Sequence, residues 1–252
     1  MSPDPAGSAP LPAGEVAYFT TTPEDRSRLT TFFRLILVIP HYIWVAIYGI
    51  AAYLAVIVAW FAILFTAKYP EGIYNFVEGW YRYYVRYLAY ANLATDKFPP
   101  FSGNPDSPYE AHLQLGPPLE KYSRWKTLLR LILLIPFEIV AYVFLIIAYL
   151  ASIISWFAIV ILGRQPQGLQ DALNFGLSYP IRLGAYAALL TEDWPVQFTD
   201  DSVAENLAAK GYSPWPPSEG GAPAATAPAA PVAPEAPAAP EPPAAPEPPA
   251  AP

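Results

Sequence analysis

The residues of this chain that could carry chemistry are few, and most lie inside or beside apolar segments. Glu138 is the only acid in the apolar run from Leu131 to Gly163. A carboxylate within a membrane often marks a proton or ion path. It also lies near the start of the run, where it could reach lipid headgroups or pair with Arg130 or Arg182. A transport role and a structural pairing are therefore both open.

A second group of charged residues follows the first apolar run. Glu78, Arg82 and Arg86 are spaced four apart, so a helix would align them in one stripe and could pair Glu78 with Arg82. Arg182 occupies the position in the second half of the chain that matches Arg86. These arginines could bind lipid phosphate or make structural pairs, and the structural pairs are the simpler explanation.

Composition excludes several kinds of site. The chain has no cysteine and two histidines, His41 and His112, which excludes thiolate metal sites and a histidine-built metal centre. It contains no Ser/His/Asp set, glycine-rich phosphate loop or His/Glu metal motif. We expect no catalytic residue, no cofactor, no metal and no enzyme activity. The net charge of −7 arises mainly in the tails and loops, so nucleic acid is not an expected partner.

The apolar runs predict a membrane protein. The run from Leu35 to Ala67 has 33 residues without Lys, Arg, Asp or Glu, the signature of a spanning helix. As one helix it would extend about 50 Å, beyond a hydrocarbon core of about 30 Å. Pro40 disfavours helical geometry at the preceding residue, so we expect a break there and one span over 41–66. A tight hairpin turning at Gly49 is the competing interpretation.

Basic amphipathic segments precede both runs. Residues 22–38 have the pattern of a short helix that starts at Thr22 and lies in the headgroup plane. The alternative is that this segment simply extends the spanning helix. The candidate interfacial basic residues of the two halves are Arg26, Arg34, Arg124, Lys126 and Arg130.

The chain contains an internal duplication. Residues 120–196 repeat residues 24–100 at a constant offset of 96, with matches such as Arg34/Arg130, Pro40/Pro136 and Arg86/Arg182. Further helices are expected at 73–94 and 172–190, either in the interface or across the membrane. The single charge, Arg182, in the second of these favours crossing. We predict an all-α integral membrane bundle of two tandem, parallel repeats, each an amphipathic interfacial helix plus two spanning helices.

The segments AWFAILFTAKYPEGIYNF and YANLATDKFPPFSG carry a family resemblance. They resemble a family of bacterial integral membrane proteins catalogued as domain of unknown function 4389. Its pattern is an arginine-led apolar helix with an Ile-Pro break, Trp-Phe-Ala-Ile-Leu, a basic-x-Pro-x-Gly turn, a later Arg and Thr-Asp-x-Tyr/Phe-Pro-Pro-Phe. The first copy fits throughout, whereas the second departs at Gln165, Glu192 and Trp194. The resemblance covers residues 24–198 and implies no catalytic residue.

Six segments are expected along the chain. These are a disordered N-terminus (1–21), membrane repeat 1 (22–100), a polar connecting loop (101–117), membrane repeat 2 (118–198), an acidic short helix or linker (199–212) and a disordered Pro/Ala/Glu-rich tail (213–252). The basic flanks predict a multi-pass protein of the inner (cytoplasmic) membrane with both termini in the cytoplasm.

These observations leave several functions open. A structural, scaffold or accessory envelope protein is the first hypothesis, and a small transporter, channel or lipid-handling protein is the alternative. The expected partner is the lipid bilayer, with anionic phospholipid as a candidate. The proline-rich tail could dock a protein partner or act only as a solubilising spacer. The oligomeric state is open.

Overall fold

The computed structural model describes residues 11, 13–20, 26–104, 109–196 and 198. Its elements, in chain order, are β1 (Val16–Thr20), α1 (Arg28–Phe32), α2 (Arg34–Thr66), α3 (Glu71–Ala91), β2 (Ala111–Leu115), α4 (Arg124–Leu162) and α5 (Gln167–Ala187). This part of the chain is mostly helical. Its two long apolar helices, α2 and α4, have the length and composition of membrane-spanning helices.

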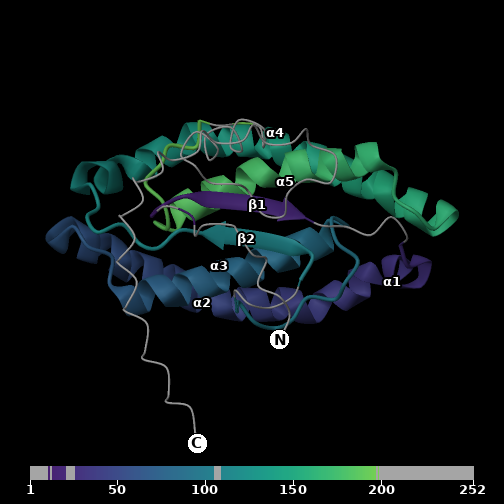
Figure 1. The fold of residues 1–252 in the computed structure, drawn as a ribbon, viewed down its shortest axis with the longest axis horizontal. Coiled ribbons are helices and arrows are strands. Elements are labelled where there is room, and N and C mark those ends of the chain that lie inside the picture. The colour runs from purple at the N-terminus through teal and green to yellow at the C-terminus, as the bar shows by residue number, and fades with distance from the viewer. Residues whose placement is uncertain (1–10, 12, 21–25, 105–108, 197, 199–252) are drawn as a thin grey trace, which may run out of the picture. The chain divides into compact units, whose positions relative to one another are not determined.

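Each repeat is built on a pair of packed helices. α2 packs on α3, and α4 packs on α5 (Figure 1). The long helices end at residues in the left-handed conformation, Ala67 (φ 57°) and Gly163 (φ 76°), which stops the helical hydrogen bonding. Pro70 and Pro166 then begin the next helices in extended backbone. The basic-x-Pro-x-Gly turn of the sequence is therefore the corner between the paired helices.

The helix break predicted at Pro40 is wrong. α2 continues through Pro40 and α4 continues through Pro136. In the first repeat the break falls at Phe33, between α1 and α2. An internal proline removes one backbone hydrogen bond, but in apolar surroundings unwinding the helix would expose many more backbone groups. The predicted interfacial helix over 22–38 is thus reduced to α1 and the first turn of α2.

The structure adds two strands to the predicted helices. β1, within the segment expected to be disordered, pairs antiparallel with β2, within the expected polar loop, so that Val16 lies opposite Leu115 and Thr20 opposite Ala111. β1 packs on α5 and β2 packs on α3. The pairing joins residues nearly 100 positions apart, which local composition does not reveal. The expected N-cap at Thr22, the segment from 199 and the tail lie outside the described residues.

Hydrogen bonds between the repeats are reciprocal. The Trp60 indole nitrogen donates to the Thr127 carbonyl (3.0 Å), and Trp156, 96 positions later, donates to Thr31 (3.1 Å). α1 and the start of α4 therefore each meet the C-terminal half of the long helix in the other repeat. The repeats are related by an approximate twofold axis, and α2 and α4 run antiparallel. The Arg26–Gly163 and Tyr122–Ala67 backbone contacts bring opposite ends of α2 and α4 together, which fixes this antiparallel course.

Candidate functional site

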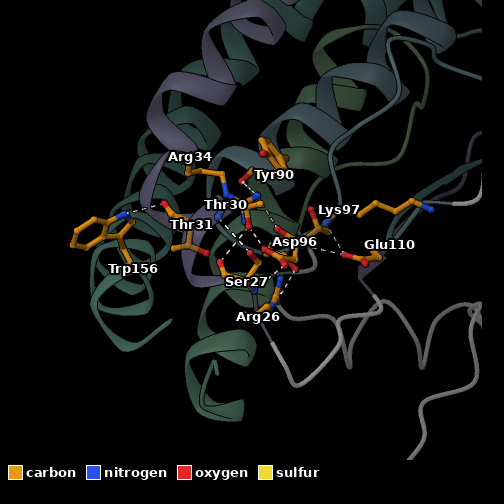
Figure 2. Close-up of polar contacts among 12 residues, drawn as sticks. Arg26, Ser27, Thr30, Thr31, Arg34, Tyr90, Asp96, Lys97, Glu110 and Trp156 are labelled. Carbon is orange, nitrogen blue, oxygen red and sulfur yellow. Dashed lines mark hydrogen bonds and ion pairs between the residues drawn. The ribbon is translucent and has the colours of Figure 1, made fainter. Parts of the chain in front are cut away.

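A buried arginine fastens the start of α2 to the loop after α3 (Figure 2). The Arg34 guanidinium donates to the carbonyls of Tyr90 (3.3 Å) and Thr95 (3.1 Å) and pairs with Asp96 (2.9 Å). It also lies over the Tyr90 ring, 4.0 Å from its centre. The other Asp96 carboxylate oxygen accepts from the backbone nitrogen of Ser27 (3.1 Å). The Thr-Asp of the family pattern is one half of this clamp.

The second repeat contains a similar clamp, without an ion pair to its arginine among the described residues. Arg130 donates to the carbonyls of Tyr186 and Thr191, and its guanidinium carbon is 4.1 Å from the centre of the Tyr186 ring. Glu192 replaces Asp96 and accepts from the backbone nitrogen of Ser123 (2.6 Å). The departure from the pattern at Glu192 therefore keeps the capping contact.

Three of the basic residues expected at the interface are buried instead. Arg26, Arg34 and Arg130 are at most 5% exposed. Arg26 donates to the Gln170 side chain (3.1 Å), and burial lowers its pKa, an effect that Asp96 and Glu110 partly offset. Carbonyl groups left free at helix ends hold such guanidinium groups inside the protein.

The remaining two basic residues lie at the start of α4. Arg124 is exposed and donates to the Phe65 carbonyl of the first repeat (2.9 Å). Lys126 is half-buried in the first helical turn, where its backbone nitrogen donates to the Ser123 hydroxyl (3.4 Å). Only Arg124 has an exposed position that suits contact with headgroups.

The charged residues along α3 make two kinds of structural contact, an ion pair within the helix and hydrogen bonds to the loop that follows it. Glu78 and Arg82 form the ion pair that their spacing predicted (2.6 Å). Arg86 instead donates to the carbonyls of Ser102 (2.8 Å) and Asn104 (2.6 Å) and so holds the loop after α3 against the helix. Gly103 allows this approach, because a Cβ there would lie 1.8 Å from the Gly79 carbonyl oxygen.

The matching residues of repeat 2 are arranged differently. Arg182 donates to Ser178, the residue that replaces Arg82. Glu138 is exposed on α4, near Tyr84 and Tyr179. Pairing with Arg130, one of the alternatives open for Glu138, does not form among the described residues, where that guanidinium is turned toward Tyr186 and Thr191. The described residues contain no cluster of His, Cys, Asp or Glu that could hold a metal ion.

An aromatic cluster around His41 was missed by sequence reasoning. His41 is fully buried, and its Nδ1 lies 2.6 Å from the Tyr83 hydroxyl. Its ring stacks on Phe101, with 4.2 Å between centres, and packs against Phe98 at 4.5 Å. The Phe-Pro-Pro-Phe ending of repeat 1 thus covers the histidine. Phe137 occupies the matching position of repeat 2. The sequence could have pointed to this contact, because His41 and the Phe-Pro-Pro-Phe ending both occur in repeat 1 and are both missing from repeat 2.

An apolar cavity of 560 Å³ lies between the repeats. Arg130 is its only charged lining residue among the described ones. Helices α2, α3, α4 and α5 all line the cavity. Representative residues are Gly49, Tyr53 and Trp60 of α2, Trp80 and Tyr84 of α3, Leu134 of α4, and Gly184 and Ala187 of α5. The volume falls within the range of pockets that bind small molecules.

Packing differences between the repeats accompany this cavity. In repeat 1, Trp80 lies against Gly49, where a Cβ would be 3.3 Å from the indole nitrogen. In repeat 2 the residue matching Trp80 is Gly176, and a Cβ there would lie 2.7 Å from the backbone nitrogen of Ala148. A large side chain, that of Trp80, therefore lies between α2 and α3, whereas the backbones of α4 and α5 are in close contact.

Comparison with known proteins identifies the family. No curated protein and no solved structure matches the chain. The family described as "Domain of unknown function (DUF4389)" matches residues 28–103 and again residues 124–199. These ranges contain the arginine and the carboxylate of both clamps and the helix pairs α2–α3 and α4–α5, and together they make up more than half of the chain. The chain therefore belongs to the DUF4389 family, of which it contains two tandem copies.

Proposed function

We propose that this chain is an integral membrane protein that serves as a structural, scaffold or accessory component of the cell envelope and not as an enzyme. The outward faces of α2 and α4 carry the proposal. Only 17% of the most apolar window of each helix is buried, and Leu35, Ile50 and Ile161 are at least 66% exposed. Apolar faces of this extent suit acyl chains and would promote aggregation in water.

Membrane fractionation tests the embedded state. After alkaline carbonate washing, which strips peripheral proteins, the chain should remain in the membrane pellet and should leave it only with detergent. Release by carbonate alone would contradict the proposal. The proposed location is the inner membrane with cytoplasmic termini, on the basis of the basic flanks. The four spans expected from the sequence are considered in the next subsection.

The scaffold role is tested through the tail. Affinity purification from native membranes should recover a defined protein partner, which deletion of residues 214–252 should remove while the shortened chain stays in the membrane. An unchanged set of co-purifying proteins would contradict a docking role for the tail and favour a spacer.

The inter-repeat cavity favours lipid handling as a second candidate function. Its walls are apolar apart from the Arg130 guanidinium, whose Nε has no hydrogen-bond partner among the described residues. An acyl chain in the cavity with an anionic group near Arg130 would match both features. Such a ligand would come from the surrounding bilayer.

A pair of matched variants tests this second function. Ala187→Phe would fill the cavity, whereas Ala91→Phe changes the corresponding residue of the other repeat, which does not line it. Native mass spectrometry of the purified protein should show bound lipid for the wild type and for Ala91→Phe, and at least a fivefold loss for Ala187→Phe. Equal lipid content in both variants would contradict binding in the cavity.

A further inference from the structure

The path of the chain limits how this molecule can lie in a membrane. One end of the protein, called here the first end, brings together the start of α2, the end of α3 and the end of α4. Arg34 bonds to the Tyr90 carbonyl there (3.3 Å), and the Arg26 backbone nitrogen bonds to the Gly163 carbonyl (3.1 Å). Both long helices therefore have one terminus at this end.

The second end brings together the end of α2, the start of α4 and the end of α5. The Tyr122 backbone nitrogen donates to the Ala67 carbonyl (2.9 Å), and the Tyr69 hydroxyl donates to the Ala188 carbonyl (3.4 Å). α3 runs from the second end to the first with 21 residues, so the two ends lie about 32 Å apart along this helix.

The described part of the connection between the repeats, residues 95–104 and 109–121, covers this distance without a helix. The chain leaves α3 at the first end, near residue 94, and starts α4 at the second end, near residue 122. The residues between them include β2, which pairs with β1 in a two-stranded sheet. A two-stranded sheet leaves backbone groups unpaired along its outer edges. This connection also carries Glu110, His112 and Gln114.

Such a segment cannot cross a lipid bilayer. Each unpaired backbone group costs several kcal/mol in hydrocarbon, and lipid-exposed irregular chain or open sheet edges do not occur there. If the two ends lay on opposite faces of the membrane, the described part of this connection and β1 would have to lie at hydrocarbon depth. The two ends must therefore be on the same face.

We infer that α2 and α4 lie lengthwise in one leaflet, roughly parallel to the membrane surface, with the β1–β2 sheet on the aqueous side. This inference rests on the proposed membrane role. The partner of the outer faces of α2 and α4 is the acyl layer of a single leaflet. The strands run along α3 and α5 (Figure 1), so the sheet can stay in water while the long helices are embedded.

Helix length and charge placement agree with this orientation. α2 and α4 are about 50 and 58 Å long, well beyond the hydrocarbon thickness of about 30 Å. Exposed charges lie at both ends, as with Lys97 and Arg164 at the first end and Lys68 at the second. An in-plane orientation keeps all of them at headgroup level, whereas an upright one would carry the ends of α2 and α4 beyond the hydrocarbon core.

Single cysteines introduced into this cysteine-free chain test the inference. The positions are Lys97→Cys and Arg164→Cys at the first end, Lys68→Cys at the second, Gln114→Cys in β2 and Ile50→Cys on the outer face of α2. A membrane-impermeant maleimide is applied to right-side-out and then to inverted membrane vesicles. The first four positions should react from one and the same side. Ile50→Cys should react only after detergent is added.

Each alternative gives a different labelling pattern. Four spans in parallel repeats would expose Lys68→Cys and Arg164→Cys on one side and Lys97→Cys on the other. An upright antiparallel arrangement would separate Lys68→Cys from Arg164→Cys. Either pattern would overturn the in-plane inference and leave the membrane role intact. Rapid labelling of Ile50→Cys without detergent, together with carbonate release, would instead overturn the membrane role itself.

Discussion

Single residues in the two clamps show how buried arginines fasten each long helix to the loop after its paired helix. Arg34 and Arg130 each satisfy two backbone carbonyls and stack on a tyrosine ring. Asp96 and Glu192 add a carboxylate that also caps a backbone nitrogen. A charge buried in this way is stable only while its partners remain. The arginines therefore act on the stability of the fold.

Asp96→Asn should expose this dependence. The substitution removes the charge that faces Arg34 at 2.9 Å, and loss of one partner from a buried pair costs about 3 kcal/mol. Denaturant unfolding in detergent micelles should show that loss of unfolding free energy. Asp193→Asn, at an exposed acid of the second repeat, should change it by less than about 0.5 kcal/mol. Equal stability of the two variants would contradict the clamp.

His112 of β2 should make stability depend on pH. Burial, and to a smaller degree Arg86, lower the pKa of His112 below its ordinary 6.5. The unfolded chain therefore binds a proton near pH 6.5 that the folded chain binds only at lower pH. Unfolding free energy should fall as the pH drops from 7 to 5.5. His112→Gln should flatten that decrease in chemical denaturation, and an unchanged pH profile would contradict the assignment.

On the scale of elements, the helix pair α2–α3 differs from the pair α4–α5 in the size of the side chains between the two helices. Trp80 lies between α2 and α3, whereas Gly176 lets α5 approach Ala148 of α4. A residue of zero side-chain volume is needed only where two backbones approach this closely. At the matching positions, Trp80 therefore separates its helix pair and Gly176 allows close contact in the other pair.

Gly176→Ala should force α4 and α5 apart. The added Cβ would lie within 3 Å of three Ala148 atoms, and overpacking of this kind costs about 1 to 3 kcal/mol. Gly168→Ala, in the same helix with no atom within 4 Å of the added Cβ, should instead stabilise α5 slightly through helix propensity. Thermal unfolding followed by circular dichroism compares the two. A stable Gly176→Ala variant would contradict the close packing.

On the scale of the whole molecule, the duplicated chain resembles two subunits of a twofold dimer joined by one connection. Trp60 of α2 and Trp156 of α4 each donate a hydrogen bond to the other repeat, and the strands pair across the repeats. Isologous contacts of this kind hold two copies together without a covalent link. The connection is therefore not needed to keep the repeats together.

Two separate chains, residues 1–106 and 107–252, should consequently associate when they are expressed together. A tag on either chain should recover both in a one-to-one ratio from detergent-solubilised membranes. Trp60→Phe combined with Trp156→Phe removes two cross-repeat hydrogen bonds, worth about 1 kcal/mol each, and should increase dissociation on dilution. Recovery of a folded, isolated half in place of the complex would contradict the pseudo-dimer.

The sequence by itself determined the features that depend on neighbouring residues. The uncharged runs predicted the long helices α2 and α4, the offset of 96 predicted the duplication, and the spacing of Glu78 and Arg82 predicted their ion pair. Each of these is a local or strictly periodic pattern. Glu138 could be singled out as an acid in an apolar run, but its surroundings could not be read from its neighbours in the chain.

Tertiary structure decided everything that depends on contacts between the repeats. The β1–β2 pairing, the burial of Arg26, Arg34 and Arg130, and the antiparallel course of α2 and α4 all bring together residues far apart in sequence. Proline geometry and the length of the apolar run together predicted a break at Pro40, and α2 continues through it. Hydropathy measures how readily a segment enters lipid, but only the path of the connecting chain reveals in which direction it can lie there.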